Sequence, residues 1–181
     1  MTSIIKVNTF QDTNGNALFN SDGSGNVTTS ATGLQNTPAF FAYLGSNQTI
    51  SNNTVTKINI NTELFDTNSM YDNSSNYRFT PTVAGKYYLY ASFYADCGGS
   101  QFQNGWISIY KNGSAYIYGQ FDNTSGNDAN GVNIPVSITD EANGSSDYYE
   151  IYCKIEDSSG SPVINANTKR THFGAYKLIG A

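Results

Sequence analysis

The fold of this chain is decided by residues 79–89, which read Phe79-Thr80-Pro81-Thr82-Val83-Ala84-Gly85-Lys86-Tyr87-Tyr88-Leu89. Pro81 presets a turn, because its ring fixes φ and it has no N–H to leave unpaired in a strand ladder. Gly85 permits a positive φ immediately before the next element. The residues that follow, as far as Ala95, are rich in aromatic and small side chains and predict a long β-strand.

On both sides of this stretch, short strand-like segments alternate with turn signals, which is the pattern of a sandwich or barrel. Asn112-Gly113 is a tight hairpin signal between two of these segments. The chain shows no helical periodicity with caps and no repeat of fixed period. The pattern therefore predicts an all-β domain with strands over residues 38–44, 56–65, 86–95, 106–111, 115–121, 132–138, 147–156 and 171–179.

The composition of the chain excludes several classes of function. Of the 181 residues, 13% are charged and 14% are aromatic, with a net charge of −5. A nucleic-acid binder needs clustered cations, and Lys169-Arg170 is the only basic pair, so nucleic acid is excluded as a partner. No apolar run is long enough for a membrane span and no signal-peptide pattern is present, so we expect synthesis in a cytoplasm and no membrane insertion.

Residues 1–33 differ from the rest and are predicted to form an attachment segment, with the main domain over residues 34–181. Ile4, Ile5, Val7 and Phe10 suggest a short strand, Asn14-Gly15 suggests a hairpin turn, and residues 17–19 and 27–29 suggest further strands. So few apolar residues cannot bury a core of their own. We expect this segment either to pack against a partner chain or to stay mobile.

A family resemblance appears once the chain is read outward from residue 79. Asp66, Tyr71, Phe79, Gly85 and Tyr87 match the signature of C1q-like domains, which this chain resembles over about residues 38–180. Leu89 and Ile60 replace phenylalanines that are common there, and the gap from Tyr71 to Phe79 is one residue longer than usual. The resemblance implies a ten-stranded antiparallel jelly roll, of the C1q and TNF type, that forms tight trimers and binds ligands without catalysis.

The N-terminal segment carries a second, shorter resemblance. Residues 5–12, together with Gly15, are similar to the leaders of structural proteins from tailed bacteriophages. This resemblance implies that the segment joins the protein to other virion proteins.

The sequence offers few candidate catalytic residues. His172 is the only histidine, and a Cys–His site would require Cys97 or Cys153 exposed beside it. Asp12, Asn14 and Asn16 begin like a calcium loop, but the sixth and twelfth positions do not fit, and the hairpin reading is preferred. We therefore expect no enzyme activity and no cofactor, and we assign no catalytic or metal-binding residue; whether an axial calcium ion is bound stays open.

Alternation along the strands indicates how the protein assembles. Tyr88, Tyr90 and Tyr94 share the strand face that a sandwich would leave exposed. Tyrosine suits interfaces because its ring is apolar and its hydroxyl tolerates water. We predict a homotrimer interface that includes these residues and, from the first strand, Phe41 and Tyr43; the alternative is an unusually aromatic solvent-exposed face.

In a jelly roll with both termini at one end, three long loops, over residues 97–105, 122–131 and 157–169, fall together at the opposite end. Polar loops on a rigid scaffold are common binding sites. Amides and carboxylates beside an aromatic ring suit sugars, so we expect a host surface glycan as ligand. The candidate ligand-binding residues are Gln101, Phe102, Asn104, Asp122, Asn123, Asn127, Asp128, Asp157, Asn165 and Asn167.

The same alternation predicts that both thiols are buried. Cys153 shares its strand face with Ile151 and Ile155, and Cys97 follows the core phase of Phe93. We expect free, reduced cysteines.

Together these observations predict a trimeric virion protein of a tailed phage, a tail or fibre module that binds a host surface through its distal loops. Two alternatives remain: a structural or decoration protein of the particle that binds no ligand, and a cellular C1q-like recognition domain.

Overall fold

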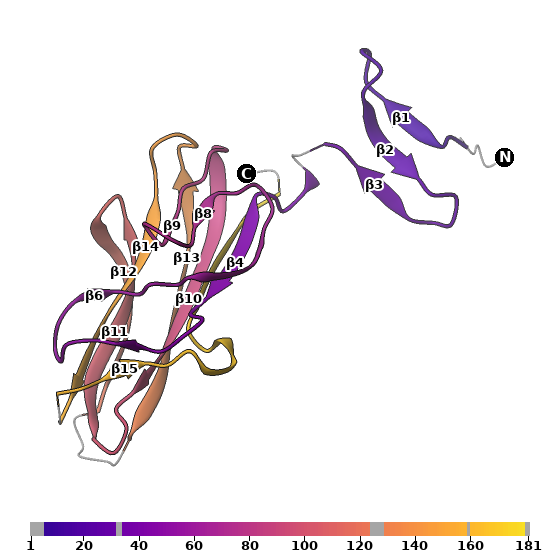
Figure 1. The fold of residues 1–181 in the computed structure, drawn as a ribbon. Coiled ribbons are helices and arrows are strands. Elements are labelled where there is room, and N and C mark those ends of the chain that lie inside the picture. Colours follow the sequence, from indigo (N-terminus) through magenta and orange to yellow (C-terminus); the bar gives the residue numbers. More distant parts are fainter. Residues whose placement is uncertain (1–5, 32–33, 124–128, 159, 180–181) are drawn as a thin grey trace.

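A computed structural model describes residues 6–31, 34–123, 129–158 and 160–179, and shows a β-sandwich preceded by a separate small sheet (Figure 1). The N-terminal sheet consists of β1 (Thr9–Gln11), β2 (Ala17–Ser21) and β3 (Val27–Thr29). The sandwich strands are β4 (Ala39–Tyr43), β5 (Gln48–Thr49), β6 (Thr56–Lys57), β7 (Thr62–Asp66), β8 (Tyr71–Asp72), β9 (Arg78–Phe79), β10 (Gly85–Asp96), β11 (Phe102–Lys111), β12 (Ser114–Asp122), β13 (Gly131–Ala142), β14 (Tyr149–Asp157), β15 (Val163–Ile164) and β16 (His172–Lys177).

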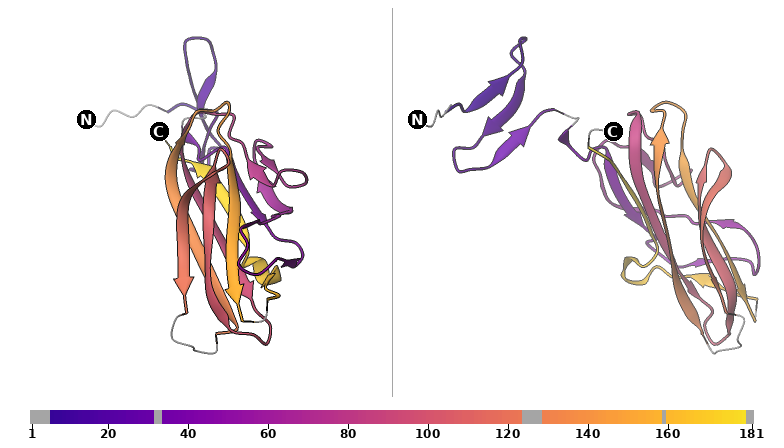
Figure 2. Two further views of the ribbon diagram at one scale, coloured as in Figure 1. Left: turned by 90° about the vertical axis from the view of Figure 1, so that its left-hand side faces the viewer. Right: turned by 180° about the vertical axis from the view of Figure 1, so that it is seen from behind.

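Two antiparallel sheets form the layers of the sandwich, and their long strands run side by side along its length (Figure 2). In the first sheet, the long strand β10 pairs with β13 on one side and with β16 and β15 on the other. Strand β16 also pairs with β4, and β4 pairs with β7, while β15 pairs with β5. The second sheet has the order β12-β11-β14-β9-β8, with β6 also paired to β14.

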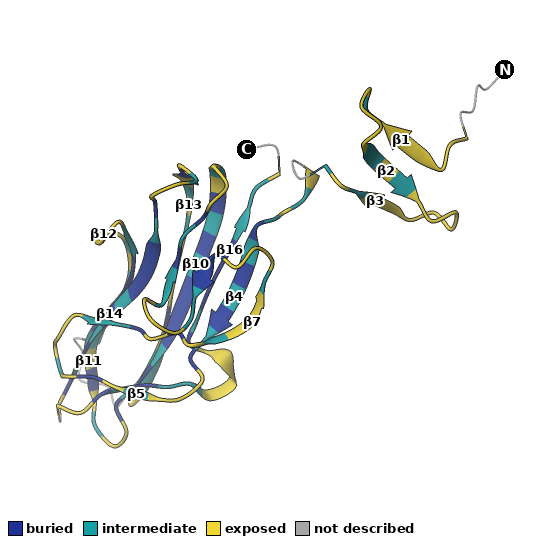
Figure 3. Ribbon diagram, turned by 45° about the horizontal axis from the view of Figure 1, so that its top comes forward, coloured by how far each residue is buried: buried dark blue, intermediate teal, exposed yellow. Residues whose placement is uncertain are grey.

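The core lies between the two sheets and contains the signature residues. Phe79, Tyr87 and Leu89 are fully buried, and the Phe79 ring stacks on Phe40 with centroids 4.7 Å apart. The Tyr71 hydroxyl donates to the Ile60 carbonyl oxygen at 2.8 Å, which satisfies the polar tip of a buried ring. Figure 3 shows the resulting stripes of buried residues along β10 and β4.

Gly85 has the positive φ, 139°, that the sequence predicted before the long strand. The Tyr87 hydroxyl then donates to the Val83 carbonyl oxygen at 2.7 Å and holds the turn against the strand. The all-β jelly-roll prediction is confirmed, whereas the predicted number of ten strands is not. The described part of the sandwich has thirteen strands. Five of them are only two residues long: β5, β6, β8, β9 and β15.

One predicted strand was wrong. The sequence predicted a single strand over residues 56–65, but β6 pairs with β14 in the second sheet and β7 pairs with β4 in the first. The chain crosses between the layers over residues 58–61. Ile58 and Ile60 are buried at this crossing, while Leu64 is 58% exposed.

The starts of the three long loops lie at one end of the sandwich, and the β11–β12 and β13–β14 connections lie at the other, as predicted (Figure 1). At the distal end, the Cys97 amide donates to the Asn130 carbonyl oxygen, and the Ser158 amide donates to the Gln101 carbonyl oxygen, so parts of the three long loops lie beside one another. The base holds the Asn112-Gly113 hairpin and the loop that connects β13 to β14. No helix in the described part of the chain is long and apolar enough to cross a membrane.

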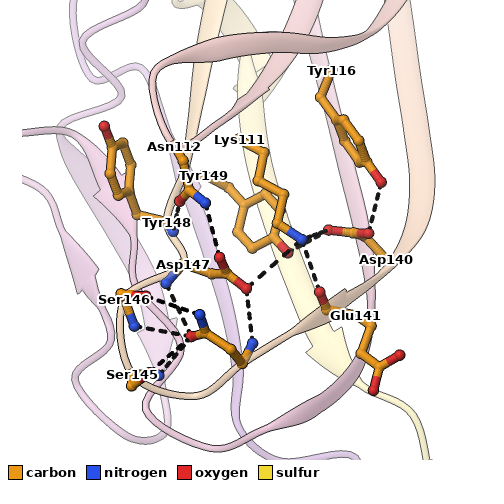
Figure 4. A network of polar contacts seen from close by, with 11 residues as sticks. Lys111, Asn112, Tyr116, Asp140, Glu141, Ser145, Ser146, Asp147, Tyr148 and Tyr149 are labelled. Atoms are coloured by element: carbon orange, nitrogen blue, oxygen red, sulfur yellow. Dashed lines mark hydrogen bonds and ion pairs between the residues drawn. The ribbon is translucent and has the colours of Figure 1, made fainter.

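A polar network fixes the base (Figure 4). Asp140 is its centre: Lys111 Nζ lies 2.6 Å from one carboxylate oxygen, and the Tyr149 and Tyr116 hydroxyls donate at 2.6 and 2.9 Å. Burial raises the pKa of Asp140, but these three donors together outweigh it and lower the pKa below its usual value. Asn112 Nδ2 also donates to Asp147 at 2.9 Å, so strands β11 to β14 are tied together at this end.

Cys97 and Cys153 are both buried and unpaired, as the alternation predicted. Burial, with the charges of Asp157 and Asp96 adding to it, raises the pKa of Cys97 to about 12. Burial also raises the pKa of Cys153 far above its usual value.

Candidate functional site

The outward face of the first sheet carries a continuous group of aromatic rings, here called the aromatic face. Tyr88 and Tyr90 stack at 5.9 Å, and Phe41 lies 6.4 Å from Tyr90 and 5.3 Å from His172. Tyr176 lies 5.6 Å from Tyr88. All five rings are half-buried in the single chain. Strand pairing thus brings residues far apart in the sequence onto one surface.

A hollow of about 420 Å³ lies within this face. Tyr88, Tyr90 and His172 line it from β10 and β16, and Pro135 and Asn133 line it from β13. Burial, together with the neighbouring Tyr176 and Tyr88, raises the pKa of Tyr90. The hollow is therefore a concave, ring-lined surface of a size that accommodates side chains of another molecule.

Tyr43 and Tyr94, the other two predicted interface residues, lie at the distal part of the same face. Lys169 Nζ lies 5.3 Å from the Tyr43 ring centroid, and the Arg170 guanidinium lies 4.7 Å from that of Tyr94. Both contacts are cation–π interactions, so the basic pair noted in the sequence borders this face. The structure brings all five predicted interface residues together and adds His172, Tyr176 and Pro135.

The second sheet also has outward-facing aromatic rings, which were not predicted from the sequence. Trp106 lies 5.1 Å from Tyr118, edge to face, and Tyr110 stacks on Tyr152 at 4.1 Å. Next to them, Glu150 is paired with both Lys57 and Arg78 at 2.7 and 2.9 Å. This outer face therefore mixes aromatic rings with paired charges.

A second hollow of about 420 Å³, here called the distal hollow, lies among the distal loops. Five predicted ligand-binding residues line it, together with two that the sequence did not indicate: Gln101, Phe102, Asn104, Asp122 and Asn123, then Gln103 and Glu156. Glu156 reaches the hollow because β11 pairs with β14 and places it opposite Asn104, whereas Gln103 lies at the irregularity of that pairing, between Phe102 and Asn104.

Hydrogen bonds fix the walls of the distal hollow. Both Asp122 oxygens accept from Gln120 Nε2, at 3.1 and 2.9 Å, and Glu156 Oε2 accepts from Asn104 Nδ2. The buried ring of Phe102 lies against Phe121, which is 43% exposed. The hollow thus combines carboxylates, amides and the edge of an aromatic pair.

Among the described residues, no ion pair neutralises the negative charge of the distal hollow. The four ion pairs among the described residues involve Glu150, Asp140 and Asp147, all remote from this end. Neither Asp122 nor Glu156 has a cationic partner among them. The hollow therefore has two carboxylates and, among its described lining residues, no lysine or arginine.

Three predicted ligand-binding residues lie outside the hollow. Asp157 is buried, and its carboxylate accepts from the Gly160 amide at 2.6 Å. Asn165 Nδ2 donates to Asp96 at 2.9 Å, and Asn167 belongs to a short 3-10 helix, η2 (Asn167–Lys169). The loop over residues 157–169 was expected to lie at the distal end. Instead, β15, which is part of this loop, pairs with β5, so the second half of the loop lies along the side of the sandwich. Asn127 and Asp128 lie outside the described residues.

Among the described residues, no group of three or more histidine, cysteine or acidic side chains is arranged to hold a metal ion. His172 is remote in sequence and in sheet from Cys153, which lies on β14 in the second sheet. Its Nδ1 lies 2.9 Å from the Lys169 carbonyl oxygen. Its ring contacts are with Phe41 and Tyr90.

Comparison with known proteins identifies the fold. No family model matches the chain, and no curated protein matches it. Among solved structures, Eiger TNF from S. frugiperda superimposes with a TM-score of 0.57 at 9% identity, over 79% of this chain and 93% of that one. Murine APRIL, crystallised at pH 5.0, gives a TM-score of 0.54 at 10% identity, over 77% of this chain and 98% of that one. The chain has a C1q/TNF-like jelly-roll fold.

Proposed function

We propose that this protein is a homotrimeric binding module that assembles through the aromatic face and holds a surface glycan in the distal hollow. The observation that carries the proposal is the aromatic face itself. The outward face of a sandwich sheet is usually polar, whereas here Phe41, Tyr88, Tyr90 and Tyr176 touch one another and remain half-exposed. Contact with a second and third copy would bury these rings.

The distal hollow supports the choice of ligand. Sugars present hydroxyl groups for hydrogen bonds and apolar ring faces for aromatic contacts, and the hollow offers amides, carboxylates and Phe121 at its edge. Because neither Asp122 nor Glu156 has a cationic partner in the part of the chain that the structure describes, an acidic glycan would be repelled. We infer that the ligand is neutral or carries an amine. Three copies around an axis would add avidity to weak single-site binding.

The place of action proposed is the virion of a tailed phage. Residues 1–33 would attach the protein to other virion proteins, and residues 34–181 would form the trimeric domain that meets the host. This part of the proposal is supported by the resemblance of residues 5–12 to phage structural proteins.

Assembly and binding are tested separately. Light scattering on the purified protein should give about three chains per particle; a monomer at micromolar concentration would overturn the proposal. For binding, Gln103→Trp fills the distal hollow and should abolish adsorption to host cells. Asn167→Trp is the matched control, because Asn167 is an exposed residue of the same loop group but does not line the hollow.

The binding test also separates the proposal from its alternative. If Gln103→Trp and Asn167→Trp both adsorb like the unaltered trimer, the distal hollow is not the ligand site. If no surface glycan is bound at all, a decoration protein without a ligand becomes the better assignment.

A further inference from the structure

The N-terminal sheet has one apolar face that nothing in the described chain covers. The register pairs Phe10 with Phe19, Phe19 with Thr29, and Ser21 with Val27, so Phe10, Phe19 and Val27 lie on the same side. Their exposures are 58%, 39% and 65%, and the two phenylalanine rings are 6.5 Å apart. In Figure 3 the sheet stands away from the sandwich and shows mostly exposed and intermediate residues.

The opposite face of this sheet is more polar. Thr9 pairs with Asn20, and Asn20 with Thr28, so these three share that side with the half-buried Leu18. A three-stranded sheet needs a packed apolar face to be stable in water. The face that needs a partner is therefore the one with Phe10, Phe19 and Val27.

The charge pattern indicates which partner fits. Strands β1, β2 and β3 contain no charged residue. The two acids of the sheet are at its hairpin tips: Asp12 accepts from the Asn14 and Asn16 amides, and Asp22 from the Ser24 and Asn26 amides. Around a symmetry axis identical residues approach one another, so charged strands would repel. Uncharged strands with an apolar row suit copies of themselves.

The connection from the N-terminal sheet to the sandwich would bring the N-terminal sheets of the three subunits close to one another. Residues 30–38 join β3 to β4, and β4 belongs to the sheet whose aromatic face is the proposed subunit interface. The trimer would therefore bring the starts of three β4 strands, and the three N-terminal sheets that precede them, to one end of the assembly.

We propose that, in the trimer, the three N-terminal sheets pack against one another through Phe10, Phe19 and Val27 and form a stalk on the symmetry axis. This inference rests on the proposed trimer. It makes the segment a part of the oligomer rather than a flexible leader, with its polar side and strand edges turned outward.

The test places single cysteines on the two faces of the sheet in the full-length protein. Val27→Cys lies on the apolar face and Thr28→Cys on the opposite one, while the native thiols are buried. With a mild thiol oxidant, Val27→Cys should give covalent dimers within minutes at a rate independent of protein concentration. Thr28→Cys should give several-fold less, and the unaltered protein none.

Each outcome decides a separate question. If light scattering shows a trimer but Val27→Cys does not crosslink, the stalk is wrong and the trimer stands. If both variants crosslink equally, the assigned face is wrong. If the protein is a monomer, the proposed function fails and the stalk fails with it.

A second variant tests the packing without crosslinking. Phe10→Ser combined with Phe19→Ser should leave a trimer by light scattering while the segment before β4 becomes several-fold more sensitive to protease. Thr9→Ser combined with Thr28→Ser is the matched control and should leave protease sensitivity unchanged. Equal sensitivity in both pairs would overturn the stalk.

Discussion

The ring of Tyr90 lies across Gly174 of the neighbouring strand: a Cβ atom built on Gly174 would be 2.5 Å from the ring. Gly174 is buried in the sheet and Tyr90 is half-buried above it. The missing side chain at Gly174 is therefore what lets Tyr90 lie low on the aromatic face, between Phe41 and Tyr88.

Substitution of Gly174 by alanine should displace Tyr90 and weaken the proposed trimer. The added methyl forces the ring upward, and overpacking of this kind costs about 1–3 kcal/mol. The trimer should dissociate at a protein concentration at least several-fold higher, measured by analytical ultracentrifugation. Gly99→Ala is the control, because nothing lies within 4 Å of its Cβ position. Equal dissociation in the two variants would show that Tyr90 does not shape the interface.

The two aromatic faces of the sandwich give opposite predictions for a charge. Tyr90→Glu places a carboxylate on the face proposed to be buried between subunits, and should yield monomers at micromolar concentration. Tyr118→Glu places the same charge on the outer face, where Tyr118 is 53% exposed, and should leave the trimer intact. Light scattering distinguishes the variants. If only Tyr118→Glu is monomeric, assembly uses the other sheet.

The alternation of side chains along each strand was enough to predict which residues face outward. Which strands pair with one another could not be predicted from the sequence. Tyr88 and Tyr90 alternate with Tyr87 and Leu89, and a period of two fixes their sides once the strand is recognised. His172 and Tyr176 join the same face only because β16 pairs with β10. Nothing local in the sequence indicates that partner or its register.

The lining of the distal hollow, too, could be predicted only in part from the sequence. Gln101, Asn104 and Asp122 were predicted from loop position, whereas Glu156 enters through the pairing of β11 with β14. Asn165 was placed with them because it lies in a long polar loop, but that loop contains β15, a two-residue strand too short to show periodicity.

If the proposed trimer binds glycans in the distal hollow, removing the negative charge there should change which glycans it binds. Wild-type protein should bind neutral or amine-bearing sugars on an array and reject acidic ones. Asp122→Asn combined with Glu156→Gln should relax the rejection roughly tenfold, since a like-charge contact of about 1.4 kcal/mol corresponds to that factor. Gln103→Trp should abolish binding of both classes. Strong binding of acidic sugars by the wild type would contradict the charge argument.

Asp140 should make the domain sensitive to acid. Its folded pKa is lowered, so its stabilising contribution is complete above the unfolded value near 3.8 and is lost as pH falls through the lower folded value. Asp140→Asn should cost about 2 kcal/mol at pH 7, because Lys111 and two tyrosine hydroxyls lose a charged partner.

Urea unfolding at constant protein concentration measures this effect. The difference in unfolding free energy between wild type and Asp140→Asn should shrink as pH falls from 7 to below 3. Asp122→Asn is the control, with a change of about 0.5 kcal/mol or less. A difference that stays constant with pH would mean that the carboxylate charge of Asp140 is not what stabilises the base.

The two thiols should be nearly inert in the folded protein. Only the thiolate reacts, and because burial raises the pKa of Cys97 to about 12, its thiolate fraction at pH 8 is on the order of 10⁻⁴. Cys153 is fully buried in the core and should react more slowly still. Labelling with a bulky disulfide reagent should therefore modify neither thiol within minutes in buffer, and two per chain in denaturant. Ser24→Cys, on an exposed loop of the N-terminal sheet, supplies a reactive reference thiol in the same chain. If Cys97 and Cys153 react as fast as that reference, the sandwich opens far more readily than its packing indicates.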